Sequence, residues 1–174
     1  MNFLKNNIFI IFFTIYFFIG LSIVQDYGIS TDEEFQRYSG FYWLCYVLEI
    51  LPFDNLRMHA VEKLSNIDGL TLPNPEDYPF YGVIFDLPLA LIETVLKIDD
   101  ANKYFLLRHK ANFLIFFLSS IFFFLILSSR FSSKKIIFIG ILLYISSPRI
   151  FGDSFYNNKD LIFLSFVTIT FYFY

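Results

Sequence analysis

The chain has 174 residues, 56% of them hydrophobic and 22% aromatic, and its formal net charge is −3. Residues 8–24 and 111–127 are uncharged runs of 17 residues each, and 136–147 and 161–174 are apolar runs of 12 and 14 residues. Runs that approach the length of a bilayer span rarely recur in a soluble domain. The composition therefore excludes an ordinary soluble protein and predicts an all-α integral membrane protein.

The acidic residues are unevenly distributed. Fourteen of the 16 lie between Asp26 and Asp100, and this segment extended to Lys110 holds only seven Lys or Arg residues. Such an acidic segment does not bind nucleic acid by counterion release, so no nucleic-acid partner is expected. Cys45 is the only cysteine, which excludes an intrachain disulfide and predicts a buried structural thiol.

No sequence motif predicts a bound metal or an organic cofactor. The chain lacks the Cys/His spacing of a metal site, a phosphate-binding loop, a dinucleotide-binding glycine pattern and a nucleophile elbow. These patterns leave open whether a divalent cation assists a reaction.

Residues 8–24, which follow Lys5, fit either a signal peptide or a first membrane span. The run is longer than the usual hydrophobic region of a signal peptide, which has about 7–15 residues. No small-residue cleavage site follows it, since residues 20–24 read GLSIV. We therefore expect an uncleaved first span.

The basic loop at residues 128–135 sets the predicted topology. It holds Arg130, Lys134 and Lys135 and no acid, and short loops rich in Lys and Arg stay in the cytoplasm. The N-terminus is then cytoplasmic, and the protein is a multi-pass protein of the inner (plasma) membrane. The predicted spans are 8–24, 109–127, 136–151 and 161–174, with external or periplasmic loops at 25–108 and 148–160.

The fourth predicted span reaches the end of the chain at Tyr174 without a charged or polar cap. Open backbone carbonyls at a helix end are costly in hydrocarbon. We therefore expect this span to be truncated, and the chain to be the N-terminal part of a longer protein that is inactive by itself.

The first external loop begins with an acidic cluster at the start of a predicted helix over residues 35–48. Ser30 with Glu33, or Thr31 with Glu34, fits a capping box. The favoured interpretation of the acids is a helix start, where the helix dipole stabilises carboxylates. The other interpretation, a general base or a cation ligand at the membrane face, stays open.

A second amphipathic helix is predicted to begin with a cap at Asp54, and His59 is expected to be exposed or interfacial within it. Its apolar face is formed by Leu56, Ala60, Val61 and Leu64. Residues 72–88 contain four prolines and predict an irregular external segment.

Residues 83–98 are mostly apolar but contain Asp86, Pro88 and Glu93. Charged groups are expensive at the centre of a bilayer. We therefore predict a helix at the membrane surface over residues 87–98 rather than a span.

Residues 147–160 (SPRIFGDSFYNNKD) are dense in charge, amide and hydroxyl groups between two apolar runs. Such groups at the edge of a hydrocarbon layer are costly unless they pair or bind something polar, so this segment is a predicted ligand site. Residues 108–110, with the sequence RHK, are predicted to form either a basic collar touching lipid phosphates or a clamp for an anionic lipid-linked substrate.

Four motifs in chain order resemble one family. They are residues 30–33 (STDE), 81–88 (YGVIFDLP), 108–113 (RHKANF) and 147–160. Together with the span order they resemble the N-terminal part of the C-type glycosyltransferases, and within these the bacterial relatives of dolichyl-phosphate-mannose protein mannosyltransferases. The resemblance covers essentially the whole chain, and the last motif is far more specific than the acidic pair.

The resemblance implies a fold and an activity. The fold would be a C-type N-terminal transmembrane bundle with juxtamembrane helices in the large first external loop. The enzyme would move a sugar from a polyprenyl phosphate to an acceptor protein, lipid or glycan on the external face. The acidic pair Asp32 and Glu33 would be catalytic, with Asp32 as the general base.

The resemblance also implies a donor site. Arg149 and Lys159 would bind the phosphate, and Arg108 and His109 would clamp the lipid-linked substrate. The groups proposed to bind sugar hydroxyls or orient these cations are Asp153, Asn157 and Asp160. Where better-known members carry a basic residue before a proline pair, this chain has Asp86-Leu87-Pro88.

A second hypothesis from a different class remains. The chain would be a non-enzymatic multispan membrane protein whose acidic external loop is a sensor or assembly module. Further spans and an external domain encoded downstream would favour the enzyme.

Overall fold

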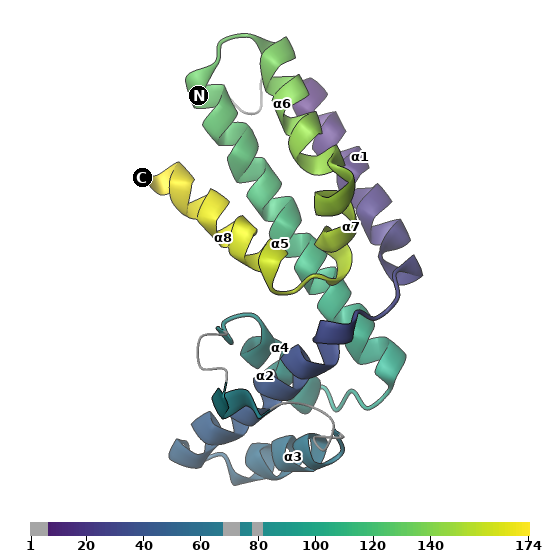
Figure 1. Cartoon of the computed structure of the whole chain (residues 1–174), viewed down its shortest axis with the longest axis vertical. Coiled ribbons are helices and arrows are strands. Elements are labelled where there is room, and N and C mark those ends of the chain that lie inside the picture. Colours follow the sequence, from purple (N-terminus) through teal and green to yellow (C-terminus); the bar gives the residue numbers. More distant parts are fainter. Residues whose placement is uncertain (1–6, 68–73, 78–81) are drawn as a thin grey trace. The chain divides into compact units, whose positions relative to one another are not determined.

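The computed structural model describes residues 7–67, 74–77 and 82–174, and within these ranges the chain forms helices and turns without a β-strand. Two compact units are present (Figure 1). The span unit comprises the residues up to Gly28 together with Leu106–Tyr174, and the loop unit comprises Ile29–Phe105. The segment predicted as an external loop over 25–108 therefore contains a folded unit.

The span unit contains two helices that are long and apolar enough to cross a membrane. One is α1 (Asn7–Ile23), continued by the short 3₁₀ helix η2 (Val24–Asp26), and the other is α5 (Ala101–Arg130). The helices α6 (Lys134–Ser146) and α7 (Pro148–Tyr156) meet at an angle of 56° and reach spanning length only as a bent pair.

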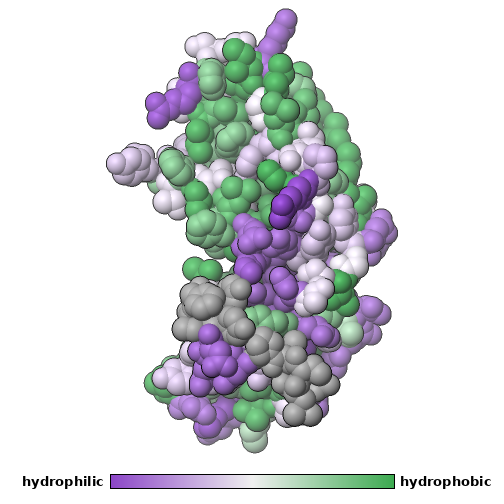
Figure 2. Space-filling view, in the orientation of Figure 1, coloured by the Kyte–Doolittle hydropathy of each residue, from purple (hydrophilic) through white to green (hydrophobic). Residues whose placement is uncertain are grey.

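The last helix, α8 (Asp160–Phe173), is apolar but has only 14 residues. On the face that Figure 2 shows, apolar side chains cover much of the span unit. Its exposed side chains include Ile15, Phe18, Leu143 and Phe163. Such a surface is suited to lipid, because a helix that is apolar all round is buried or spans a membrane.

Aromatic side chains hold the span unit together. Phe9 and Phe13 of α1 pack on Phe124 of α5, with ring centroids 4.6 and 5.8 Å apart. Farther along α1, Tyr16 packs on Phe113 of α5 at 5.7 Å. Later residues of α1 contact earlier residues of α5, so the two helices are antiparallel, as their ribbons show (Figure 1).

A chain of hydroxyl groups links three helices inside the apolar bundle. The Tyr144 hydroxyl of α6 lies 3.1 Å from Ser119 Oγ of α5 and 3.3 Å from Thr168 Oγ1 of α8. Away from water, such groups need partners within the protein. The link therefore fixes α5, α6 and α8 against one another without leaving a buried hydroxyl unbonded.

The predicted span over 136–151 is wrong as a single helix, and the predicted external loop over 148–160 is mostly helical. The helix breaks at Ser147, whose φ and ψ are −55° and 120°, and α7 starts at Pro148. A proline disfavours the helical conformation in the residue before it, but its missing N–H suits the first position of a new helix.

The helix that contains the second predicted span, 109–127, begins before it. The helix α5 starts at Ala101, where the Asp100 carboxylate accepts a hydrogen bond from the Lys103 backbone N–H at 3.1 Å. This is the usual bond of an N-cap aspartate. Arg108, predicted to stand at the outer end of the span, therefore lies about two turns inside the helix.

The loop unit contains the predicted helices. They are α2 (Thr31–Ile50), α3 (Asp54–Ser65) and α4 (Asp86–Val95), with a short 3₁₀ helix η3 (Pro75–Asp77). With 10 residues α4 is too short to span a bilayer, so the prediction of a non-spanning helix in this region is confirmed. The membrane-surface position of α2 and α4 stays a prediction.

The core of the loop unit is small and apolar, and Phe41, Leu44, Leu48, Ala60 and Ala90 are buried in it. Cys45 is buried with them, as predicted, and desolvation raises the pKa of its thiol.

One predicted helix cap in the loop unit is wrong. Asp54 is the first residue of α3 rather than its N-cap, which is Phe53, because the chain turns into the helix one residue earlier.

The Tyr42 hydroxyl of α2 donates a hydrogen bond to Glu76 of η3, and this bond raises the pKa of Tyr42 to about 12. The bond therefore persists at neutral pH.

Some predicted features lie outside the described residues. These are Lys5, Tyr81 of the second motif, and part of the proline-rich segment 72–88, including Pro73 and Pro79.

We predict that Gly40→Ala destabilises the loop unit. A Cβ at Gly40 would lie 2.7 Å from the Asp86 carbonyl oxygen, so α2 and α4 would have to separate. Overpacking of this kind costs about 1–3 kcal/mol. Hydrogen exchange of α2 and α4 amides should rise, whereas Gly82→Ala, with no atom within 4 Å of the added Cβ, should change little. Equal exchange in the two variants would contradict the close packing.

Candidate functional site

The two acids at the start of α2 have different environments. Glu33 is buried, and its carboxylate accepts a hydrogen bond from the Ser30 backbone N–H at 2.7 Å, which completes the predicted Ser30–Glu33 capping box. The Asp32 side chain is exposed, and among the described residues it forms no hydrogen bond or ion pair. Helix capping therefore accounts for Glu33 but not for Asp32.

Five predicted site residues gather where α7 meets α8, around Asn157. The Asn157 side-chain oxygen accepts hydrogen bonds from the backbone N–H groups of Lys159 and Asp160, at 3.3 and 2.9 Å. Its amide nitrogen lies 3.5 Å from an Asp153 carboxylate oxygen and 3.4 Å from one of Asp160. Asn157 therefore holds the two carboxylates on either side of the turn.

Arg149 stands at the edge of this cluster. Its Nε lies 3.7 Å from Asp153 Oδ2, and its side chain is 88% exposed. The other Asp153 oxygen accepts a hydrogen bond from the Tyr156 hydroxyl at 3.0 Å. The Arg149 guanidinium is thus directed along α7 by a weak contact and still presents most of its donors outward.

The predicted basic group at residues 108–110 is not uniformly exposed. Arg108 and His109 are buried, with 1% and 3% of their surface exposed, and Lys110 alone is exposed. The interpretation of all three as a collar on lipid phosphates is therefore wrong. The cause is the early start of α5, which places Arg108 and His109 inside the helix rather than at its end.

Asn112, one turn further along α5, is a structural residue that the sequence analysis did not single out. Its amide donates to the backbone carbonyls of Asp153 and Ser154, at 3.2 and 3.1 Å. These carbonyls belong to the last turn of α7, where helical partners run out, although the Asp153 carbonyl also accepts the Asn157 backbone N–H at 2.8 Å. Asn112 therefore caps α7 from a neighbouring helix and supports the cluster around Asn157.

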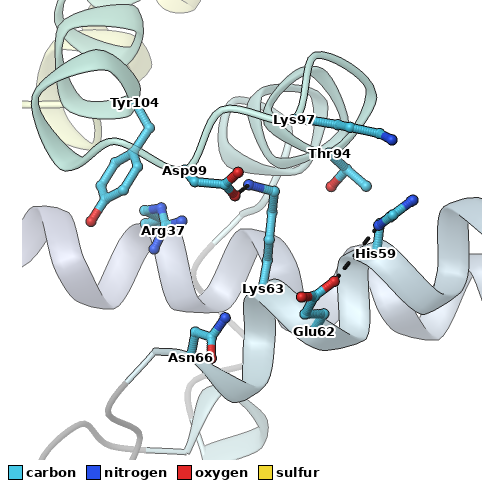
Figure 3. Close-up of a pocket in the computed structure, with 9 residues that line it drawn as sticks. All are labelled: Arg37, His59, Glu62, Lys63, Asn66, Thr94, Lys97, Asp99 and Tyr104. Carbon is cyan, nitrogen blue, oxygen red and sulfur yellow. Dashed lines mark hydrogen bonds and ion pairs between the residues drawn. The ribbon is translucent and has the colours of Figure 1, made fainter.

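The loop unit has a polar cavity of about 410 Å³ between α2, α3 and the turn after α4. Figure 3 shows the Lys63–Asp99 pair in the middle, with Arg37 and Tyr104 on one side and His59 on the other. No local sequence pattern indicates this cavity, because its lining comes from four separate segments. His59, predicted to be exposed or interfacial, is about half exposed on this lining.

Hydrogen bonds hold the lysine in the cavity. Lys63 Nζ donates to the Ile98 carbonyl oxygen at 2.6 Å and to Asp99 Oδ1 at 2.7 Å, and the lysine side chain is buried. The bond from Lys63 lowers the pKa of the Asp99 carboxyl. This interaction therefore stabilises the folded unit at neutral pH, and the contribution is lost as the pH falls through the lowered pKa.

Within the described ranges, no group of three or more His, Cys, Asp or Glu side chains is placed to hold a metal ion. Comparison of the chain with protein-family models, with curated proteins and with solved structures finds no match. Asp32 and Glu33 belong to the loop unit, and the other seven predicted site residues belong to the span unit.

We predict that Asn112→Leu loosens α7. The substitution removes both amide bonds and leaves the buried Ser154 carbonyl without this donor, which costs about 1–3 kcal/mol. Hydrogen exchange in residues 150–158 should increase in the purified protein. The control is Ser120→Ala on the same helix, since among the described residues the buried Ser120 hydroxyl bonds only to the Phe117 carbonyl of α5 itself. Unchanged exchange in Asn112→Leu would rule out the capping role.

Proposed function

We propose that the protein is a membrane glycosyltransferase that moves a sugar from a polyprenyl-phosphate donor to an acceptor protein, lipid or glycan at the external membrane face. The single observation that carries this proposal is that Glu33 is buried and bonded whereas Asp32 is exposed. Glu33 satisfies the helix start, which leaves the exposed carboxylate of Asp32 available as a general base.

The environment of Asp32 suits a base. Its carboxylate stands in the first turn of α2, where the helix dipole favours the charged form. A general base must come within hydrogen-bond reach of the hydroxyl that it deprotonates. An exposed carboxylate on a helix meets this need better than Glu33, which is buried and already bonded.

The cluster around Asn157 supports a donor site. Arg149 and Lys159 are the proposed partners of the donor phosphate, because charge-assisted bonds from Arg and Lys are strong at anionic oxygens. Asp153, Asn157 and Asp160 form a bonded group beside them, and their oxygens suit sugar hydroxyls. Arg108 and His109 remain proposed substrate contacts from within α5.

The resemblance to the C-type glycosyltransferases supports the same proposal and implies a chain of the inner membrane with four spans. The alternating direction of α1, α5 and α6 (Figure 1) agrees with such a bundle. Asp86 departs from the family pattern, and its buried position at the start of α4 argues against a phosphate contact there.

A non-enzymatic role has one observation in its favour. The loop unit is compact and has its own polar cavity, as a sensor or assembly module would. The catalytic test below separates the two proposals.

We predict that Asp32→Asn abolishes sugar transfer without loss of folded protein. Asn keeps the size and helix-capping capacity of Asp but cannot accept the proton, and losing a general base costs about 10²–10⁴-fold in rate. The measurement is transfer of labelled sugar in membranes that contain the natural gene product.

Glu34→Gln is the matched control for this prediction, because Glu34 is an exposed carboxylate in the same helical turn. It should retain activity within a few-fold of wild type. Activity of Asp32→Asn at the level of Glu34→Gln would show that the catalytic base lies elsewhere. If the wild-type protein transferred sugar from no polyprenyl-phosphate donor, the result would favour the non-enzymatic sensor or assembly module.

The proposed topology predicts opposite labelling of two engineered cysteines. Ser132→Cys lies in the turn between α5 and α6, next to Arg130 and Lys134, and should be protected from a membrane-impermeant maleimide in intact cells. Asn74→Cys, in the loop unit, should react. The chain without an engineered cysteine is the control and should not be labelled, because Cys45 is buried. Labelling of Ser132→Cys from outside would invert the topology and remove the external site.

A further inference from the structure

The cavity of the loop unit is suited to a polar ligand. Its volume of about 410 Å³ lies in the range of small-molecule sites. Typical sites are lined mainly by apolar groups, whereas all nine described residues around this one carry a polar atom, and none of the nine is aliphatic or Phe or Trp. A space of this composition favours a ligand with many hydrogen-bonding groups.

Arg37 is held rigidly at the wall of the cavity. Its Nε donates to Glu93 Oε2 at 3.0 Å, and Glu93 is completely buried. Its guanidinium carbon lies 3.8 Å from the ring centre of Tyr104 and 5.0 Å from that of Phe41. The carboxylate and the two rings fix the plane of the guanidinium before any ligand binds.

The terminal nitrogens of Arg37 remain available. Among the described residues, neither of its Nη atoms has a hydrogen-bond partner, and the residue lines the cavity (Figure 3). A fixed guanidinium presents two parallel donors, the geometry that matches two oxygens of a phosphate or carboxylate. Arg37 is therefore a preorganised oxyanion contact.

Other cations lie around the same space. Lys63 uses two of its three donors on Ile98 and Asp99, and Lys97 lies beyond that pair on the side opposite Arg37 (Figure 3). Against these three cations the lining has two carboxylates, Glu62 and Asp99. Glu93, behind Arg37, brings the local charge to zero with His59 neutral, so the cavity can accept an anion without first expelling one.

We propose that this cavity binds a phosphomonoester of a small polar molecule, with phosphate oxygens on the Nη atoms of Arg37 and the polar remainder extending past Lys63 toward Lys97. A phosphate alone would leave much of the 410 Å³ unfilled. The site is distinct from the proposed catalytic carboxylate. Five residues along a helix turn by about 140° beyond one full turn, so Asp32 and Arg37 lie on different faces of α2.

Calorimetric titration of the full chain with inorganic phosphate tests the proposal, at fixed ionic strength and in phosphatidylcholine nanodiscs. Saturable binding is expected, with a dissociation constant on the order of 1 mM for this minimal probe. Arg37→Lys keeps the positive charge opposite Glu93 but loses the two parallel donors of the guanidinium. It should weaken phosphate binding by about tenfold or more. No saturation at about 10 mM phosphate would overturn the proposal.

A second variant keeps the test independent of the buried ion pair. Lys97 is exposed and has a φ of 51°, a conformation that asparagine tolerates. Lys97→Asn therefore removes the charge with little risk to folding, and should weaken phosphate binding several-fold. Lys103→Gln removes an exposed lysine of the same unit that does not line the cavity, and should bind as the wild type does.

The phosphate affinities of the variants separate a specific site from nonspecific attraction, and the lipid composition identifies the ligand. Wild-type affinity in both Arg37→Lys and Lys97→Asn, or an equal loss in Lys103→Gln, would show nonspecific attraction and overturn the site. Repeating the titration in nanodiscs that contain phosphatidic acid identifies the source of the phosphomonoester. Weaker phosphate binding there would identify a lipid headgroup as the occupant and overturn the small polar ligand, whereas unchanged binding supports a soluble molecule.

Discussion

Hydrocarbon offers no hydrogen-bond partner to a backbone N–H or C=O group, and this constraint governs the span unit. All its long segments are helical, and the buried hydroxyls of Ser119, Ser120 and Thr168 bond across helices or to a carbonyl of their own helix, whereas the buried Tyr16 hydroxyl has no hydrogen-bond partner among the described residues. At Ser147, where the helix breaks, the following residue is a proline that has no N–H to satisfy. At the other end of α7, the Asn112 amide reaches across from α5 to the Ser154 carbonyl and to the Asp153 carbonyl, which also accepts the Asn157 backbone N–H. The polar cluster around Asn157 can form beside apolar helices because its backbone is satisfied first.

The same sequence element can serve structure and chemistry at adjacent positions. In the acidic cluster that starts α2, the third helical residue is the one that reaches back to the N-cap, so Glu33 becomes buried and bonded. Asp32, one residue earlier, points away from the cap by about 100° around the helix. Helix geometry alone therefore separates a capping acid from an exposed one. Under the proposed function, the two interpretations of this cluster apply to different residues, helix capping to Glu33 and the general base to Asp32.

Features encoded by local pattern could be predicted, and features that depend on distant contacts could not. The uncharged run over 8–24 matches α1 and η2 closely, because hydrophobicity by itself defines that helix. The start of α5 was missed by eight residues, although Asp100 before Ala101 is a recognisable cap signal, since the expectation followed the apolar run instead. The cavity was invisible to sequence reasoning, because Arg37, Lys63 and Asp99 are far apart in the chain and converge only through the packing of α2, α3 and the turn after α4. Asn112 was missed for the same reason: nothing near it in sequence indicates that its partners are residues 153 and 154.

The ion pair between Arg37 and Glu93 is costly for so small a unit. Desolvating two charges is expensive, and replacing a buried pair by apolar residues of similar volume is often neutral or stabilising. Stability therefore does not explain why a core built on a few residues such as Phe41 and Leu44 should enclose a guanidinium. A binding role does, because the carboxylate that neutralises Arg37 engages only its Nε, and the aromatic contacts constrain its plane while its two terminal nitrogens stay accessible. An arginine with only a structural role would gain most if the protein accepted hydrogen bonds from both of its Nη atoms as well as from Nε. The pair is arranged instead as a support that holds a cation in a fixed orientation at the cavity wall.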